Sequence, residues 1–182
     1  MNSEIFTKLF GNDTISDAII SCSESEDDIG VVLRLHLITE NYLEAFICAA
    51  IGLENLFDTE PSIGKPFKLN YYKKLELASK LGLPEASFKA LDKLNYLRNQ
   101  LAHRIQSDLI DDAIISSLST HIRNIDGDTL LPLIEEKAAF FNPDGSSRDI
   151  YSMKSNKTPV RIKMIILVFS LIRRTTLKCF DI

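Results

Sequence analysis

The longest uninterrupted helical pattern in this chain is IGVVLRLHLITENYLEAFICAAIGLENL, residues 29–56. Asp27 and Asp28 precede it and suit the start of a helix, while the turn-forming run DTEP at residues 58–61 follows it. A pattern of this length predicts one long central helix.

Five further segments have a helical pattern bounded by caps or turn residues: residues 68–81, 85–105, 111–125, 129–141 and 160–180. Gly82 stops the first of them and Pro84 opens the next. Residues 1–26 are expected to be an N-terminal extension with one or two short helices, and residues 142–158 an exposed loop. Together these elements predict an all-α, antiparallel bundle of about five to six helices that forms a single domain, residues 1–182.

The composition fits one helical domain inside the cell. Of 182 residues, 45% are hydrophobic and 25% charged, which is enough for a real core, and seven Gly and six Pro are too few for many strands joined by tight turns. Three cysteines, without a Cys-x-x-Cys pair, indicate neither a disulfide framework nor a zinc site. No signal peptide or membrane span is expected either, because the longest apolar run, residues 164–172, is well short of the roughly 20 residues that cross a bilayer. We therefore expect a cytoplasmic protein.

The formal net charge of −4 is unevenly distributed. Residues 1–60 carry a balance of −10, whereas residues 150–182 carry +6, mostly on the predicted basic C-terminal helix, residues 159–182. That helix could contact a polyanion, or it could be a solvated face beside an acidic element of the same chain. Weak candidates for RNA contacts are Arg104, Lys163, Arg173 and Arg174.

An arginine interrupts the apolar side of the predicted helix 85–105. At 100° per residue, one stripe collects Leu91, Leu94, Leu97, Leu101 and Ile105. Arg98 falls inside this stripe, where a guanidinium needs either solvent at the edge or an anionic partner. Asn99 and His103 are four positions apart and share the polar border of the stripe.

The central helix shows the same anomaly, because His36 and Glu40 project into its apolar arc. Glu40 is therefore the expected partner of Arg98. This pair is either a structural link between two helices or a support for a functional arginine. His36 is interpreted as a core histidine whose hydrogen bonds are satisfied.

The segment Leu97-Arg98-Asn99-Gln100-Leu101-Ala102-His103 resembles the signature of the HEPN superfamily. In that signature an arginine is followed by a polar residue and, a few positions later, by a histidine near the end of a helix in a small helical bundle. Residues 35–44, LHLITENYLE, are similar to the acidic long helix of several HEPN groups. The resemblance covers residues 28–125 in order and architecture, and it extends to proteins similar to the mannitol operon regulator.

The resemblance implies metal-independent RNA cleavage without a cofactor, by a homodimer whose two motifs line one cleft. His103 would then be the acid–base group, Arg98 would stabilise charge on the phosphate, and Asn99 would orient the phosphate or the imidazole. No metal site is expected, since the acids at residues 24–28 are consecutive and suit solvation better than ligation. The setting would be a toxin with an antitoxin or regulatory partner, an antiviral defence factor or a stress RNase.

Two other functions stay open. The first is a non-catalytic HEPN-like interaction or transcription-regulatory module, in which Arg98 and His103 are structural. The second is a nucleic-acid-binding regulator that works through the basic C-terminal helix, although a net acidic charge gives little help to non-specific binding.

Overall fold

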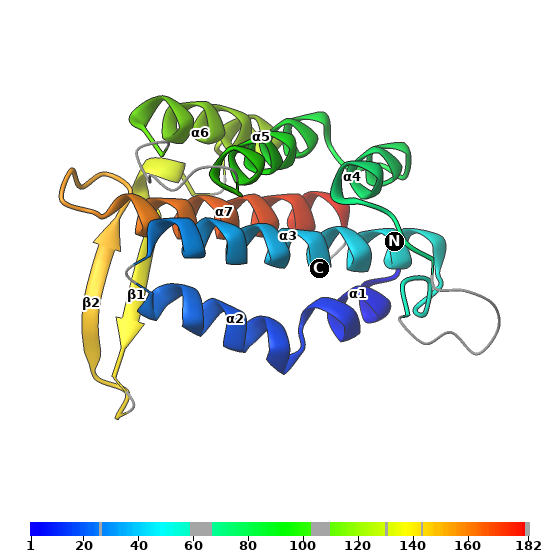
Figure 1. Cartoon of the computed structure of the whole chain (residues 1–182), viewed down its shortest axis with the longest axis horizontal. Helices are drawn as coiled ribbons and strands as arrows, with labels where there is room; N and C mark the ends of the chain where they lie inside the picture. The colour runs from blue at the N-terminus through cyan, green and yellow to red at the C-terminus, as the bar shows by residue number, and fades with distance from the viewer. Residues whose placement is uncertain (26, 59–66, 103–109, 130, 143, 181–182) are drawn as a thin grey trace.

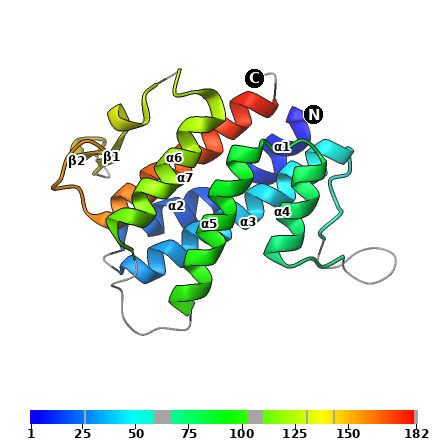
Figure 2. The same ribbon diagram turned by 90° about the horizontal axis from the view of Figure 1, so that it is seen from above.

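A long helix, α3 (Asp28–Ile51), runs through the middle of the molecule beside α7 (Val160–Cys179) (Figure 1). The structure, a computed structural model, describes the whole chain except residues 26, 59–66, 103–109, 130, 143 and 181–182. Helices α1 (Ser3–Phe10) and α2 (Asp13–Glu24) cover one side of α3. The opposite side of α3 is covered by α4 (Tyr71–Lys80) and α5 (Glu85–Ala102), while α6 (Asp112–Asp126) packs beside α5 and over α7, as the view from above shows (Figure 2). The prediction of a mainly helical bundle is confirmed for the described residues.

The two central helices run in the same direction, so the bundle is not antiparallel throughout. Arg161 Nη1, at the start of α7, lies 3.9 Å from Asp28 Oδ1 at the start of α3. Farther along both helices, Thr176 Oγ1 lies 3.4 Å from Tyr42 Oη. Short connections favour antiparallel neighbours, but more than a hundred residues separate α3 from α7, and this distance along the chain removes that constraint.

Helix ends follow the local capping chemistry closely. The Asp27 side chain accepts a hydrogen bond from Ile29 N at the start of α3. At the other end Gly52 adopts φ 75°, a left-handed conformation that suits glycine, so α3 ends at Ile51 instead of continuing to Leu56 as predicted. Asn70 and Asp111 cap α4 and α6 in the same way as Asp27 caps α3.

A β-hairpin replaces the helix that we predicted over residues 129–141, and that prediction is wrong. A short 3₁₀ turn (Leu133–Glu135) leads into β1 (Lys137–Phe141), which pairs antiparallel with β2 (Ser147–Ser152). The predicted exposed loop at residues 142–158 thus contains a strand. Its turn-forming residues close the hairpin, with Asn142 N donating to Ser146 O over 2.8 Å and Gly145 at φ 82°.

Aromatic side chains join the N-terminal helices and the C-terminal end of the chain to α3. The Phe6 ring packs against both Tyr42 and Phe180, with centroids 5.5 and 4.5 Å away. Phe46 on α3 contacts Phe180 from the other side, at 6.1 Å. The N-terminal segment is therefore joined to the packed core through Ile5 and Phe6 of α1. Nowhere in the described residues is a helix both long and apolar enough to cross a membrane.

Candidate functional site

The C-terminal half of α5 carries the described part of the predicted motif. Its leucines hold the helix against the core, since four of the five side chains in the predicted apolar stripe are buried: Leu91, Leu94, Leu97 and Leu101. Arg98 lies at the edge of this stripe and is half-buried, while Asn99 is exposed. The structure therefore brings Arg98 and Asn99 to the surface together. His103, Arg104 and Ile105 lie outside the described residues.

The Arg98 guanidinium contacts a neutral side chain. Its Nη1 donates to Asn99 Oδ1 over 3.1 Å. Within the described part of the chain, no carboxylate comes within ion-pair distance of Arg98. Among the described residues no acid neutralises Arg98, so this partly exposed cation can meet an anionic ligand.

The predicted ion pair between Glu40 and Arg98 does not form. Glu40 Oε1 instead lies 2.6 Å from Lys74 Nζ on α4, and Glu44 Oε1 lies 2.5 Å from the same nitrogen. Lys74 is only 5% exposed. Burial alone would lower the pKa of Lys74, but the hydrogen bonds to both glutamates raise it above its ordinary value. The helical pattern placed Glu40 on the inner face correctly, but α3 contacts both α4 and α5, and the lysine of α4 takes the carboxylate.

A buried histidine lies next to the Arg98 region. His36 Nε2 is 3.2 Å from Asn95 Oδ1 on α5, and its ring stacks on Tyr71 with centroids 4.1 Å apart. Thr39 Oγ1 donates to His36 O and lies 3.0 Å from Tyr71 Oη. The interpretation of His36 as a satisfied core histidine is confirmed by these contacts.

Burial and charged neighbours both shift the pKa of His36. Burial lowers the pKa of His36, and the charges of Arg98 and Lys74 lower it further. The hydrogen bond that His36 Nε2 makes to Asn95 Oδ1 and the charge of Glu40 raise it. His36 is 5% exposed and hydrogen-bonded, so it is not placed to exchange protons with a ligand.

On the C-terminal helix the structure contradicts one predicted RNA contact. The Arg174 side chain is fully buried, with Nη1 2.6 Å from Asp126 Oδ1 and 2.9 Å from Asp128 Oδ1, and Nη2 3.1 Å from Glu136 Oε1. Arg173 Nη2 lies 2.6 Å from the same Glu136 oxygen. Arg174 therefore anchors the segment before the hairpin to α7 and cannot meet RNA. Lys163 is half-buried on the same helix.

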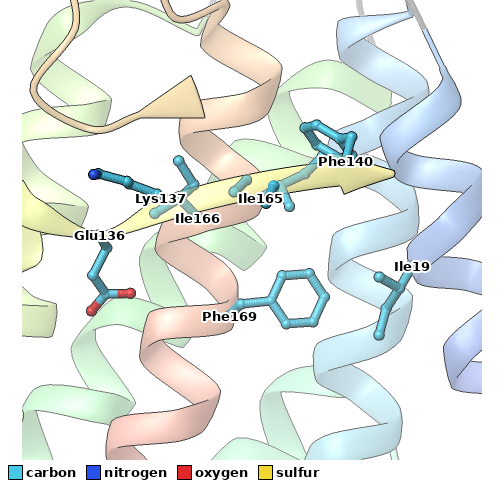
Figure 3. A pocket seen from close by; sticks show the side chains of 9 residues that line it. Ile19, Glu136, Lys137, Phe140, Ile165, Ile166 and Phe169 are labelled. Atoms are coloured by element: carbon cyan, nitrogen blue, oxygen red, sulfur yellow. The ribbon is translucent and has the colours of Figure 1, made fainter. Parts of the chain in front are cut away.

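The largely apolar cavity at the hairpin holds no comparable chemistry. Its volume is about 370 Å³, and Figure 3 shows the Phe140, Phe169 and Ile19 side chains around it. Glu136 contributes a carboxylate to the wall, but this group is bound by Ser170, Arg173 and Arg174. The cavity offers apolar contact without an acid–base pair or nucleophile.

Sequence reasoning missed several residues near the motif. Asn95, Lys93 and Tyr96 precede it on α5, and Lys93 Nζ lies 5.4 Å from the centre of the Tyr96 ring. The signal was available, because Lys93, Tyr96 and Asn99 are three apart in sequence and share one side of a helix. In the described ranges, no group of three or more His, Cys, Asp or Glu side chains is arranged to hold a metal ion.

Comparison with protein-family models, with curated proteins and with solved structures found no significant match.

Proposed function

We propose that this protein is a metal-independent endoribonuclease of the HEPN type. The observation that carries the proposal is the state of Arg98, which is half-exposed, lies beside Asn99 and, among the described residues, has no acidic partner. A guanidinium enclosed and neutralised by its own subunit, as Arg174 is, would have favoured a purely structural role. Arg98 is instead free to bind phosphate.

The proposed chemistry needs one acid–base group and one fixed cation. The ribose 2′-oxygen attacks the adjacent phosphorus, the bond from phosphorus to the 5′-oxygen breaks, and the products end in a 2′,3′-cyclic phosphate and a 5′-hydroxyl. His103 takes the proton of the 2′-hydroxyl and returns it to the leaving 5′-oxygen. Arg98 stabilises the negative charge that builds on the phosphate oxygens, and Asn99 holds the guanidinium through its 3.1 Å contact.

We further propose that the active form is a homodimer, in which two motifs face one cleft. Such a protein would act as a toxin, an antiviral defence factor or a stress RNase. Light scattering of the purified protein should give twice the chain mass of 20.5 kDa, and a chain-sized particle at micromolar concentration would contradict this part of the proposal.

The decisive experiment incubates the purified protein with total RNA in EDTA. We expect cleavage without added divalent metal, and cyclic phosphate ends on the products. Arg98→Ala and His103→Ala should each slow cleavage by at least about 10²-fold and leave the far-UV circular dichroism spectrum intact. Arg123→Ala is the matched control, an exposed arginine on α6 to which the proposal gives no role in cleavage. Cleavage that persists in both motif variants, or that stops on chelation, would overturn the mechanism.

The second candidate is a non-catalytic interaction module of the same fold, and the hairpin favours it. Phe141 and Ile150 are 61% and 64% exposed, which is unusual for side chains of this size and suits contact with a protein. Under this alternative no variant cleaves RNA, and Phe141→Ser weakens capture of a partner.

A further inference from the structure

The exposed side of α5 combines an aromatic ring with cations just ahead of Arg98. Lys93, Tyr96 and Asn99 are spaced three residues apart, so each side chain lies about 4.5 Å farther along the helix axis than the one before. Tyr96 is 56% exposed and is the most exposed of the five tyrosines. A large exposed ring on a well-packed helix offers a flat apolar surface to a ligand.

One cation lies against this ring, since Lys93 Nζ is 5.4 Å from the Tyr96 ring centre. Lys93, like Arg98, makes no ion pair with any described carboxylate. Asn99 lies about one turn beyond Tyr96 on the same side of α5, and its Oδ1 accepts a hydrogen bond from Arg98 Nη1. An exposed ring with one cation against it and a second cation held about one turn farther along fits a polyanion that also carries flat bases.

The aromatic and basic run at the start of α4 lacks these features. Tyr71 and Lys74 are buried there, whereas Tyr72 and Lys73 face solvent. Lys73 Nζ is neutralised by Glu76 Oε2 at 2.7 Å. Tyr72 is therefore a matched control for Tyr96, since it is an exposed tyrosine on a neighbouring helix without a free cation beside it.

We infer that Tyr96 is a stacking platform for a base of single-stranded RNA, with Lys93 and the Arg98–Asn99 pair binding the flanking phosphates. The inference deepens the proposed function and rests on it, because it names the form of RNA that reaches Arg98. Stacking on an aromatic ring needs an unpaired base and tolerates any of the four, while the cations bind the backbone. The platform thus selects unpaired segments over duplexes and gives little sequence preference.

The chain has no tryptophan, so a single Tyr96→Trp substitution supplies a site-specific fluorescent probe. The ligand is a short 2′-O-methyl RNA oligonucleotide, which cannot be cleaved through a 2′-hydroxyl, together with a version in which all nucleotides are abasic. We expect the bases to quench the indole fluorescence of the Tyr96→Trp variant, the abasic chain to leave it unchanged, and Tyr72→Trp to respond to neither. Tyr96→Ala should weaken binding about ten-fold, Tyr96→Phe should retain it, and Tyr72→Ala should match the parent.

Three outcomes would overturn the platform. They are equal quenching by the abasic chain, unchanged affinity in Tyr96→Ala, or a change of oligomeric state in Tyr96→Ala, which would make Tyr96 a contact between subunits. Failure of the proposed nuclease is recognised separately. In that case the 2′-O-methyl oligonucleotide binds and quenches as expected, but natural RNA stays intact. If the Tyr96→Ala variant cleaves natural RNA at the parent rate when the substrate is limiting, the stacking platform is contradicted and the nuclease proposal still stands.

Discussion

At the scale of single residues, the acids of this protein determine which cations stay available. Glu40 and Glu44 both bind Lys74, so neither neutralises Arg98 one helix away. Lys73 is matched by Glu76 and Lys89 by Glu85, whereas Lys93 and Arg98 contact a ring and an amide. Lys93 and Arg98 are thus two cations without a described acidic partner on the same helix as the exposed ring of Tyr96.

Lys74 is expected to matter for stability more than either glutamate. Lys74→Met removes a buried cation and leaves two partly buried carboxylates side by side, so we expect the free energy of unfolding to fall by about 2 kcal/mol, between the values for exposed and buried pairs. Glu40→Gln should cost about 1 kcal/mol or less, because Glu44 still holds Lys74. Urea denaturation checks both values. A larger loss in Glu40→Gln than in Lys74→Met would show that Glu40 has another partner.

His36 should make the stability depend on pH. Burial lowers the pKa of His36 in the folded protein below its unfolded value of about 6.5. Above pH 6.5, roughly, the imidazole is neutral in both the folded and the unfolded state, so it does not change the free energy of unfolding. As the pH falls below this value, the unfolded chain binds the proton more readily than the folded protein does, and the free energy of unfolding decreases. Thermal melts between about pH 7.5 and about pH 5.5 should show a steeper loss for the parent than for His36→Gln. Parallel curves would contradict the prediction.

At the scale of elements, the helices were predictable and the hairpin was not. The caps Asp27, Asn70 and Asp111 are local, and each helix that they open begins within three residues of its predicted start. In contrast, Lys137-Ala-Ala-Phe-Phe141 has no alternation of apolar and polar residues, so its pattern fits a helix or a strand equally well. What makes it a strand is pairing with residues 147–152 and packing on α7, which are non-local.

In the candidate site, too, the features that depend on local helix geometry were predictable, and the features that depend on helix packing were not. The apolar stripe of α5 fixed the face on which Arg98 lies, because that depends only on helix geometry. The partner of Glu40 was not predictable, since it depends on which helix packs beside α3. The burial of Arg174 was not predictable either, because its three acidic partners come from the last residue of α6 and from the segment between α6 and β1.

Substitution of Arg174 should lower the free energy of unfolding more than substitution of its neighbour Arg173. Arg174→Met leaves Asp126, Asp128 and Glu136 close together without their shared cation, and broken buried pairs typically cost about 3–5 kcal/mol. The neighbouring Arg173 is 40% exposed, so Arg173→Met should cost about 1 kcal/mol or less. Chemical denaturation of the two variants measures the difference. Equal stabilities would mean that the Arg174 network does not hold the hairpin segment in solution.

At the scale of the whole molecule, the basic C-terminal end is largely neutralised by the chain itself. Of its seven cations, four form ion pairs with acids elsewhere in the protein: Lys154, Arg161, Arg173 and Arg174. This observation favours the alternative that the sequence left open, a basic helix beside acidic elements of its own chain. The proposed RNA binding must then come from a small local surface, against a net charge of −4.

A local surface has a measurable salt signature. Each phosphate neutralised on a single strand contributes a slope of about −0.7 to the logarithm of affinity against the logarithm of salt concentration. Since Lys93 has no described acidic partner, Lys93→Gln should flatten the slope for the 2′-O-methyl oligonucleotide by about 0.7. Lys73→Gln should leave the slope unchanged, because Glu76 already takes up the charge of Lys73. The two variants remove the same formal charge from an acidic protein, so any effect of net charge alone would change both slopes equally. Only a contact between Lys93 and a phosphate makes them differ.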